Sequence, residues 1–212
     1  MHRQIVTMGD SHSLRCFEQH PHIADSTTLF GYNKLDGKTA FNLTRHEKQV
    51  QKIRRSLRDK HIIFVFGEVD VRIHIKYKAM QTRMAPEILI RNTADRYTDY
   101  VSKLRGRGYS IHVFNVIPTG NFSSTPEARR WRKNLSYPFL ASRQERTRYT
   151  EEMNSRLAEF CAGKNIPFID IYDYLIDQNG KRKKELIYDF SHLNSKTADL
   201  VMSHYQFDRK EI

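Results

Sequence analysis

Short apolar runs that alternate with helical patterns constrain the fold of this chain more than any other feature. Residues 62–66 form an uninterrupted apolar run that ends at Gly67, and residues 111–117 form a second apolar-rich run that ends at Pro118. Runs of this length are typical of strands buried on both faces of a parallel sheet. Because helical patterns lie between the runs, the sequence predicts an α/β fold with a mainly parallel sheet.

The other elements expected from the sequence continue this alternation. Strands are expected over residues 4–8 and 167–171, and a short helix is expected to open within residues 14–19. Thr44 and Glu47 have the spacing of a capping box at the start of a helix. The longer helical patterns extend over residues 44–58, 86–104, 142–163 and 195–205.

The length and composition exclude several classes of protein. A chain of 212 residues suits one substantial core, so we expect residues 1–212 to form one three-layer α/β/α domain. No apolar run approaches the roughly 18 residues that a membrane span requires, and the N-terminal residues lack the pattern of a secretory signal. We therefore expect a cytoplasmic protein without a membrane span. Cys16 and Cys161 lack disulfide or zinc-like spacing, which indicates two buried or half-buried free thiols.

The formal net charge of +12 is open to two interpretations. The basic residues are spread along the chain, and no known nucleic-acid-binding motif accompanies them. This distribution favours a solvated basic surface and argues against a nucleic-acid partner. An anionic polymer as substrate is the alternative.

The first segment that carries chemistry is Gly9, Asp10 and Ser11, directly after the first expected strand. In parallel sheets, functional groups gather at the carboxyl ends of the strands. A serine at this place would project from the edge, and its backbone N–H would face a developing oxyanion. The same residues also fit a polar turn in which Ser11 or Ser13 caps a helix.

The second segment contains Asp189 and His192, three residues apart, before the last expected helix. In this arrangement His192 takes a proton from Ser11, while Asp189 orients the imidazole and stabilises its charged form. The alternative is that Ser191 or Asn194 caps the final helix and that the histidine is incidental.

Two further segments are weaker candidates. Gly67 closes the buried run and is followed by Glu68, Asp70 and Arg72, which suits the rim of an active site or a surface ion pair. Gly37 lies in a turn-like segment, where its N–H either approaches a ligand or simply closes a turn.

Taken in order, these segments resemble the SGNH/GDSL hydrolase family over most of the chain. The G-D-S block matches Gly9, Asp10 and Ser11, the D-x-x-H block matches Asp189 and His192, and Gly37 is the candidate for the glycine block. The resemblance implies a flavodoxin-like α/β/α fold and a serine esterase that needs no cofactor or metal.

The chain departs from the family at the asparagine that donates to the oxyanion, because Val69 stands in its place. A missing donor typically costs several kcal/mol of transition-state stabilisation. Arg72 and Asn115 are the candidate replacements; on an extended chain Arg72 would share a face with Asp70. Arg72 could instead bind an anionic substrate or only neutralise Glu68 and Asp70. The G-E-x-D-x-R form is similar to a variant branch that is associated with bacterial surface polysaccharides.

The expected reaction is cleavage of an ester-linked acyl group, with O-acetyl on a saccharide as the preferred substrate. Aromatic and basic residues mixed within residues 119–140 suit an anionic saccharide, although a flexible basic loop fits them equally. Transfer of the acyl group to a sugar, by the same residues, is one alternative. A non-catalytic glycan-binding module is the other. His12 and His74 are expected to be structural, and no metal site is expected at His20 and His22.

Overall fold

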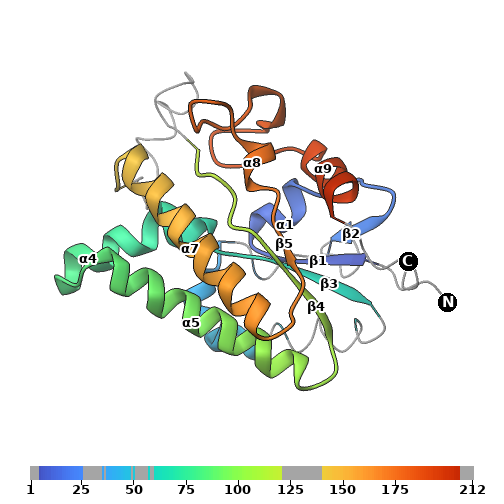
Figure 1. Cartoon of the computed structure of the whole chain (residues 1–212), viewed down its shortest axis with the longest axis horizontal. Coiled ribbons are helices and arrows are strands. Elements are labelled where there is room, and N and C mark those ends of the chain that lie inside the picture. The colour runs from blue at the N-terminus through green and yellow to red at the C-terminus, as the bar shows by residue number, and fades with distance from the viewer. Residues whose placement is uncertain are drawn as a thin grey trace.

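Every strand that the structure describes belongs to one parallel sheet. The computed structural model describes residues 5–25, 35, 37–48, 50, 57, 60–120 and 140–205. The strand order is β2-β1-β3-β4-β5 (Figure 1). The strands are β1 (Ile5–Gly9), β2 (Ile23–Asp25), β3 (His61–Val65), β4 (Ser110–Phe114) and β5 (Phe168–Ile169). The predicted α/β sandwich with a mainly parallel sheet is therefore confirmed.

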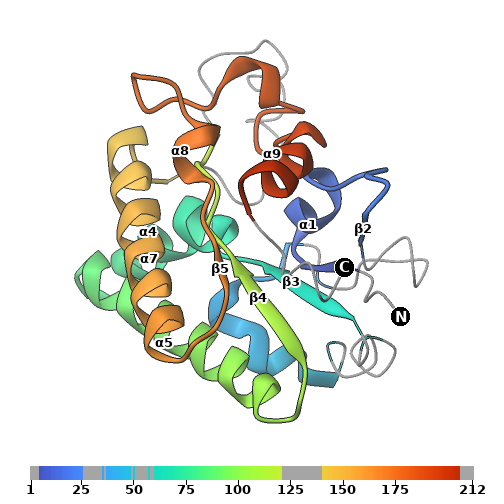
Figure 2. The ribbon, with the colours of Figure 1, turned by 45° about the vertical axis from the view of Figure 1, so that its right-hand side comes forward.

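Alternation of side chains along the central strand assigns one core to each face of the sheet. Ile62 and Phe64 pack with the long helices α5 (Pro86–Arg105) and α7 (Arg143–Gly163). Ile63 and Val65 pack on the other face, with two residues directly after α1 (Ser11–Arg15) and with residues of α8 (Tyr172–Leu175) and α9 (Lys196–His204). Figure 2 shows α5 and α7 on one side of the strands and α1 and α9 on the other. Both faces of β3 are thus covered, as its continuous apolar run predicts.

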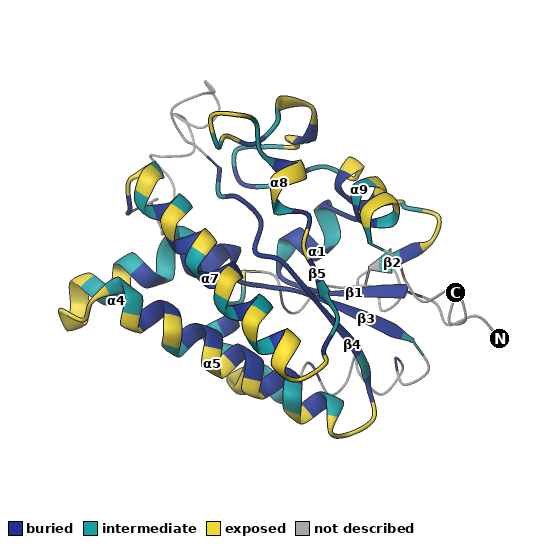
Figure 3. Cartoon of the chain, viewed as in Figure 1, coloured by how far each residue is buried: buried dark blue, intermediate teal, exposed yellow. Residues whose placement is uncertain are grey.

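The long helices have the positions that the sequence predicts, and α7 has a capping box at its start. The Ser142 hydroxyl accepts a hydrogen bond from the Glu145 amide, and the Glu145 carboxylate accepts one from the Ser142 amide. Glu145 also forms an ion pair of 2.7 Å with Lys76 on α4 (Ile75–Thr82). Figure 3 shows that α5 and α7 are buried toward the sheet and exposed on their outer faces.

None of the helices within the described ranges is long and apolar enough to cross a membrane.

Two local predictions were wrong. Thr44 does not cap a helix, because it lies inside the 3₁₀ helix η1 (Ala40–His46); much of the rest of the expected helix lies outside the described residues. The segment after Gly67 is not extended, because the Val71 amide bonds to the Gly67 carbonyl and the chain turns into the π-helical segment η2 (Asp70–His74).

Several elements have no counterpart among those predicted from the sequence. They are short or lie in polar segments: β2, α4, α8, η2 and the 3₁₀ helix η4 (Lys184–Leu186).

The two cysteines are free and buried, as predicted. Burial raises the pKa of Cys161 to about 12, so this thiol is chemically inert near neutral pH.

A buried histidine pair makes folding sensitive to acid. His61 Nδ1 lies 3.2 Å from His112 Nε2, and His112 Nδ1 lies 3.0 Å from the Tyr205 hydroxyl. Burial, together with repulsion from His61 and Arg105, lowers the pKa of His112 from 6.5 to about 4. Between these values the unfolded state binds more protons than the folded state, so stability falls as the pH falls.

Replacing His112 by Gln should weaken this acid sensitivity. The native protein is expected to lose about 3 kcal/mol more unfolding free energy between pH 7 and pH 4 than the variant does. Urea unfolding at several pH values measures the difference, and His22→Gln, at an exposed histidine, is the control. Parallel pH profiles for native protein and His112→Gln would contradict the assignment.

Candidate active site

Ser11 is placed by the end of β1 and by the cap of the short helix that follows. The Asp10 amide donates to the Val65 carbonyl over 3.1 Å, and the Asp10 carboxylate accepts from the His12 amide over 2.9 Å. A side chain at Gly9 would overlap the Val65 carbonyl, so only glycine permits this approach. Ser11 therefore leaves the sheet at its carboxyl edge, as the first residue of α1.

Ser11, His192 and Asp189 lie in one chain of hydrogen bonds. The Ser11 hydroxyl lies 2.8 Å from His192 Nε2, and His192 Nδ1 lies 2.8 Å from an Asp189 carboxylate oxygen. The His192 side chain is 19% exposed and that of Asp189 35% exposed. The residues meet across 181 positions of sequence separation, and solvent reaches them.

The environment of Asp189 keeps its carboxylate ionised. Burial raises the pKa of Asp189, but hydrogen bonds from the His192 side chain and from the His192 and Ser191 amides outweigh burial and lower it well below the ordinary value. An ionised Asp189 accepts a hydrogen bond from His192 Nδ1–H, so Nε2 carries the lone pair that faces Ser11. This arrangement suits removal of the serine proton.

The loop that carries Asp189 and His192 is held by a buried arginine that the sequence analysis missed. Arg182 donates to the Ser191 carbonyl over 2.9 Å and to the Phe190 carbonyl over 2.6 Å. Gly120 packs so closely that a Cβ atom there would overlap both the Phe190 carbonyl and the Arg182 guanidinium. Neither residue belongs to a recognisable motif, so the sequence gives no sign of this role.

A second buried arginine supports the strand end next to this loop. Arg146 donates to the Gly120 carbonyl over 3.1 Å, to the Ala141 carbonyl and to the Thr119 hydroxyl. It therefore joins α7 to the segment after β4. Because Arg146 lies in a polar stretch of α7, nothing in the sequence distinguishes it from its neighbours.

Glu68 and Arg72 form a buried ion pair next to His12. Arg72 Nε lies 2.8 Å and 2.9 Å from the two Glu68 oxygens, and a Glu68 oxygen lies 3.8 Å from His12 Nε2. Burial raises the pKa of Glu68, but attraction to Arg72 and His12 outweighs burial and lowers it. The pair exists because η2 is helical, which brings residues four apart together. The ion pair that the sequence suggested is therefore present, but it is largely buried and does not lie at the surface. The expectation that Arg72 shares an extended face with Asp70 was wrong, because η2 is helical.

Asp70 anchors the segment that follows Gly37. Its carboxylate accepts hydrogen bonds from the Ala40 amide over 2.6 Å and from the Phe41 amide over 3.3 Å, and lies 3.5 Å from His74 Nδ1. Burial raises the pKa of Asp70, although these contacts oppose the rise. Gly37 itself is exposed, with a φ of +64° that favours glycine.

Asn115 connects β4 to the segment after β5. Its side-chain oxygen accepts from the Ile171 amide over 3.0 Å, and its amide donates to the Val116 carbonyl over 3.0 Å. Val69 is buried at the entry to η2. The aromatic and basic residues that were expected to bind a saccharide lie within residues 121–139, which are outside the described residues.

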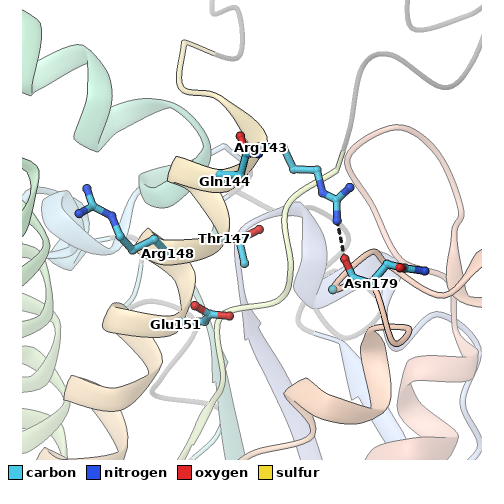
Figure 4. Close-up of a pocket in the computed structure, with 7 residues that line it drawn as sticks. Arg143, Gln144, Thr147, Arg148, Glu151 and Asn179 are labelled. Atoms are coloured by element: carbon cyan, nitrogen blue, oxygen red, sulfur yellow. Dashed lines mark hydrogen bonds between the residues drawn. The ribbon is translucent and has the colours of Figure 1, made fainter.

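A polar groove runs between the first turns of α7 and the turn at residues 179–180. It has a volume of about 450 Å³, and the Arg143 guanidinium donates across it to the Asn179 carbonyl (Figure 4). All of its lining residues except the glycine carry polar side-chain groups: Arg143, Gln144, Thr147, Arg148, Glu151, Asn179 and Gly180. No local pattern in the sequence signals this groove, because its two sides are far apart along the chain.

Comparisons with known proteins agree with this architecture. A family model described as an SGNH domain (fused to AT3 domains) matches residues 2–207. No match was found among curated proteins.

Solved structures share the fold at low sequence identity. A GDSL-like lipase from Bacteroides thetaiotaomicron is 17% identical with a TM-score of 0.60, covering 94% of this chain and 83% of that one. A lipase/acylhydrolase from Enterococcus faecalis is 15% identical with a TM-score of 0.54, covering 95% and 94%. The acetyl xylan esterase AlAXEase is 13% identical with a TM-score of 0.56, covering 95% and 99%.

Substitution of Gly120 by Ala should displace the loop that carries His192. The added Cβ atom meets a carbonyl and a guanidinium, so we expect a loss of about 1–3 kcal/mol of unfolding free energy. We also expect loss of the NMR signal of the proton between His192 and Asp189. Gly163→Ala is the matched control, because a Cβ atom at Gly163 meets no atom within 4 Å. An unchanged proton signal in Gly120→Ala would contradict this role.

Proposed function

Because the chain belongs to the SGNH hydrolase family, we propose that it is a serine esterase in which Ser11, His192 and Asp189 form the catalytic triad. The observation that carries the proposal is the continuous hydrogen-bonded chain from the Ser11 hydroxyl through His192 to Asp189. The substrate we propose is an O-acetyl group on a saccharide.

The proposed reaction has two steps. The Ser11 oxygen attacks the ester carbonyl carbon while its proton passes to His192 Nε2. The tetrahedral intermediate then collapses, the bond to the alcohol oxygen breaks, and the alcohol takes the proton from His192. Water then attacks the acyl-enzyme in the same way, with His192 as base and then as acid, and the carboxylic acid is released. Asp189 remains ionised and stabilises the imidazolium in both steps.

The oxyanion is the part of this mechanism for which the chain departs from its family. We propose the Ser11 and Gly37 amides as donors, with Arg72 in place of the missing asparagine. Two observations support Arg72 over Asn115. The Arg72 side chain is 13% exposed and is fixed by Glu68, whereas Asn115 is buried and its side chain already bonds to Val116 and Ile171.

Two observations support a saccharide ester over a long-chain lipid. The side chains that line the groove in Figure 4 carry guanidinium, amide, hydroxyl and carboxylate groups, which can form hydrogen bonds to sugar hydroxyls. One structure with the same fold is named as an acetyl xylan esterase. Two arginines of the groove in this chain, Arg143 and Arg148, would also favour an anionic sugar, although Arg148 pairs with Glu87 over 3.0 Å.

Hydrolysis and acyl transfer use the same residues and differ in the acceptor. We propose hydrolysis, since His192 and Asp189 are in contact with solvent and water therefore reaches the acyl-enzyme. The ordered triad also favours an enzyme over a glycan-binding module, which would have no use for the serine–histidine contact.

Substitution of Ser11 by Ala tests the proposed nucleophile. The native protein is expected to form one adduct with a fluorophosphonate probe, seen by intact mass, and to release acetate from an acetylated saccharide. Ser11→Ala should form no adduct and should lose at least ~10⁴-fold in rate. Ser155→Ala, at an exposed serine on α7, should behave as native. A folded native protein that forms no adduct would refute the esterase proposal.

Substitution of Arg72 by Lys tests the proposed oxyanion donor. Lysine keeps a positive charge next to Glu68 but loses the planar guanidinium, so we expect kcat to fall about 100-fold while KM changes little. Arg156→Lys is the matched control, because Arg156 pairs with Glu152 across the same four-residue spacing on α7. Equal kcat values for Arg72→Lys and native protein would exclude Arg72 as a donor.

A further inference from the structure

A second histidine, His12, lies buried beside the proposed triad and follows Ser11 in the chain. Its ring centroid is 4.8 Å from that of His192, and its side chain is 1% exposed. His12 Nδ1 lies 2.9 Å from an Asp10 carboxylate oxygen, and Nε2 lies 3.1 Å from the Ser191 carbonyl oxygen. The proposed mechanism makes no use of this ring.

The partners of His12 fix its protonation. The Ser191 carbonyl oxygen is only an acceptor, and the Asp10 oxygen that faces Nδ1 already accepts the His12 amide. A neutral imidazole has one N–H and one lone pair, so it would direct a lone pair at one of these oxygens. Only the imidazolium, with two N–H groups, satisfies both contacts.

The charges around His12 stabilise the same form. Asp10 faces one nitrogen, and Glu68 lies 3.8 Å from the other. Two cations share partners with His12, because Arg72 is bonded to Glu68 and Arg182 to the Ser191 carbonyl. Burial would lower the pKa of His12, but attraction to Asp10 and Glu68 and the two hydrogen bonds outweigh burial and raise it above 6.5. Such a buried cation is tolerated because carboxylates flank it.

The carbonyl that His12 binds lies between the two triad residues of the loop. Ser191 precedes His192 directly, and its carbonyl oxygen receives donors from His12 and from Arg182. Through Asp10, which caps α1 and accepts from the His12 amide, the same ring is tied to the turn that presents Ser11. His12 thus links the nucleophile turn to the loop of the general base.

Resting on the triad assigned above, we propose that His12 is a positioning residue, held as an imidazolium, that fixes His192 against Ser11 through the Ser191 carbonyl. Loss of its proton replaces one charge-assisted hydrogen bond by lone-pair repulsion. The loop then shifts away from Ser11, and small displacements of a general base reduce rate strongly. Activity is therefore expected to fall on the alkaline side, at a pH above 6.5.

The charge of His12 can be measured without any substrate. With ¹⁵N-labelled histidine, His12 at pH 7 should show two protonated ring nitrogens, each with a slowly exchanging proton, and His12→Gln identifies these signals. A His12 ring with one unprotonated nitrogen at pH 7 would overturn the proposal.

Kinetics of Ser11 labelling tests the positioning role. Glutamine can donate to only one end of this site at a time, so His12→Gln should slow fluorophosphonate labelling and lower kcat by about 10–100-fold with little change in KM. His12→Lys, which keeps a cation that can donate to both oxygens, should recover part of the rate and move the alkaline limb to higher pH. His112→Gln is the control, since that histidine contacts His61 and Tyr205 and no triad residue.

The outcomes separate this inference from the proposed function. If the native protein is labelled and a folded His12→Gln is labelled at the same rate, the positioning role is overturned and the esterase stands. If the native protein is not labelled at all, the esterase proposal fails and the positioning role fails with it. Equal slowing in His12→Gln and His112→Gln would mean a general structural effect and would also overturn the role.

Discussion

The close approach of β1 to β3 determines where every group of the candidate site lies. Gly9 is in register with Val65, and the next amide, that of Asp10, bonds to the Val65 carbonyl. A side chain at Gly9 would prevent this contact. Because β1 and β3 end at the same level, the segment with Ser11 leaves β1 next to the turn at Gly67, which follows β3. The side chain of His12 then lies 3.8 Å from Glu68, and the charged side chains of Asp10 and Arg72 contact this pair.

The loops around the site are stabilised by charged donors on backbone carbonyls. Arg182 and His12 bind the Ser191 carbonyl, and Arg146 binds the Gly120 carbonyl. Hydrogen bonds from charged groups contribute about 1.5–3 kcal/mol each, more than those between neutral groups. Burying a guanidinium is costly unless its donors are used. The irregular loops therefore hold their shape only while these side chains stay in place.

The sequence predicted the parts of this molecule that depend on local patterns. Continuous apolar runs predicted β3 and β4, and the long helical patterns predicted α5 and α7. The family motifs identified Ser11, Asp189 and His192 as candidates, which the structure brings together. The helical turn after Gly67 was missed because its residues alternate in polarity as in a strand. The roles of Arg182, Arg146 and Gly120 depend on contacts between distant segments, and no local pattern signals such contacts.

The charges near Ser11 offer a physical account of how a site without the family's asparagine can stabilise an oxyanion. That asparagine is a neutral donor, and Val69 provides none. In its place the turn into η2 joins Arg72 to Glu68, and Glu68 is also flanked by His12. Without these cations Glu68 would oppose negative charge on the substrate. With Arg182 included, three cations (with His12 as the imidazolium proposed above) compensate the carboxylates of Asp10, Glu68 and Asp189. Arg72 can then act on an oxyanion in a partly desolvated site, where fixed charges act more strongly than in water. On this proposal, a preorganised cluster of charges replaces one directed hydrogen bond.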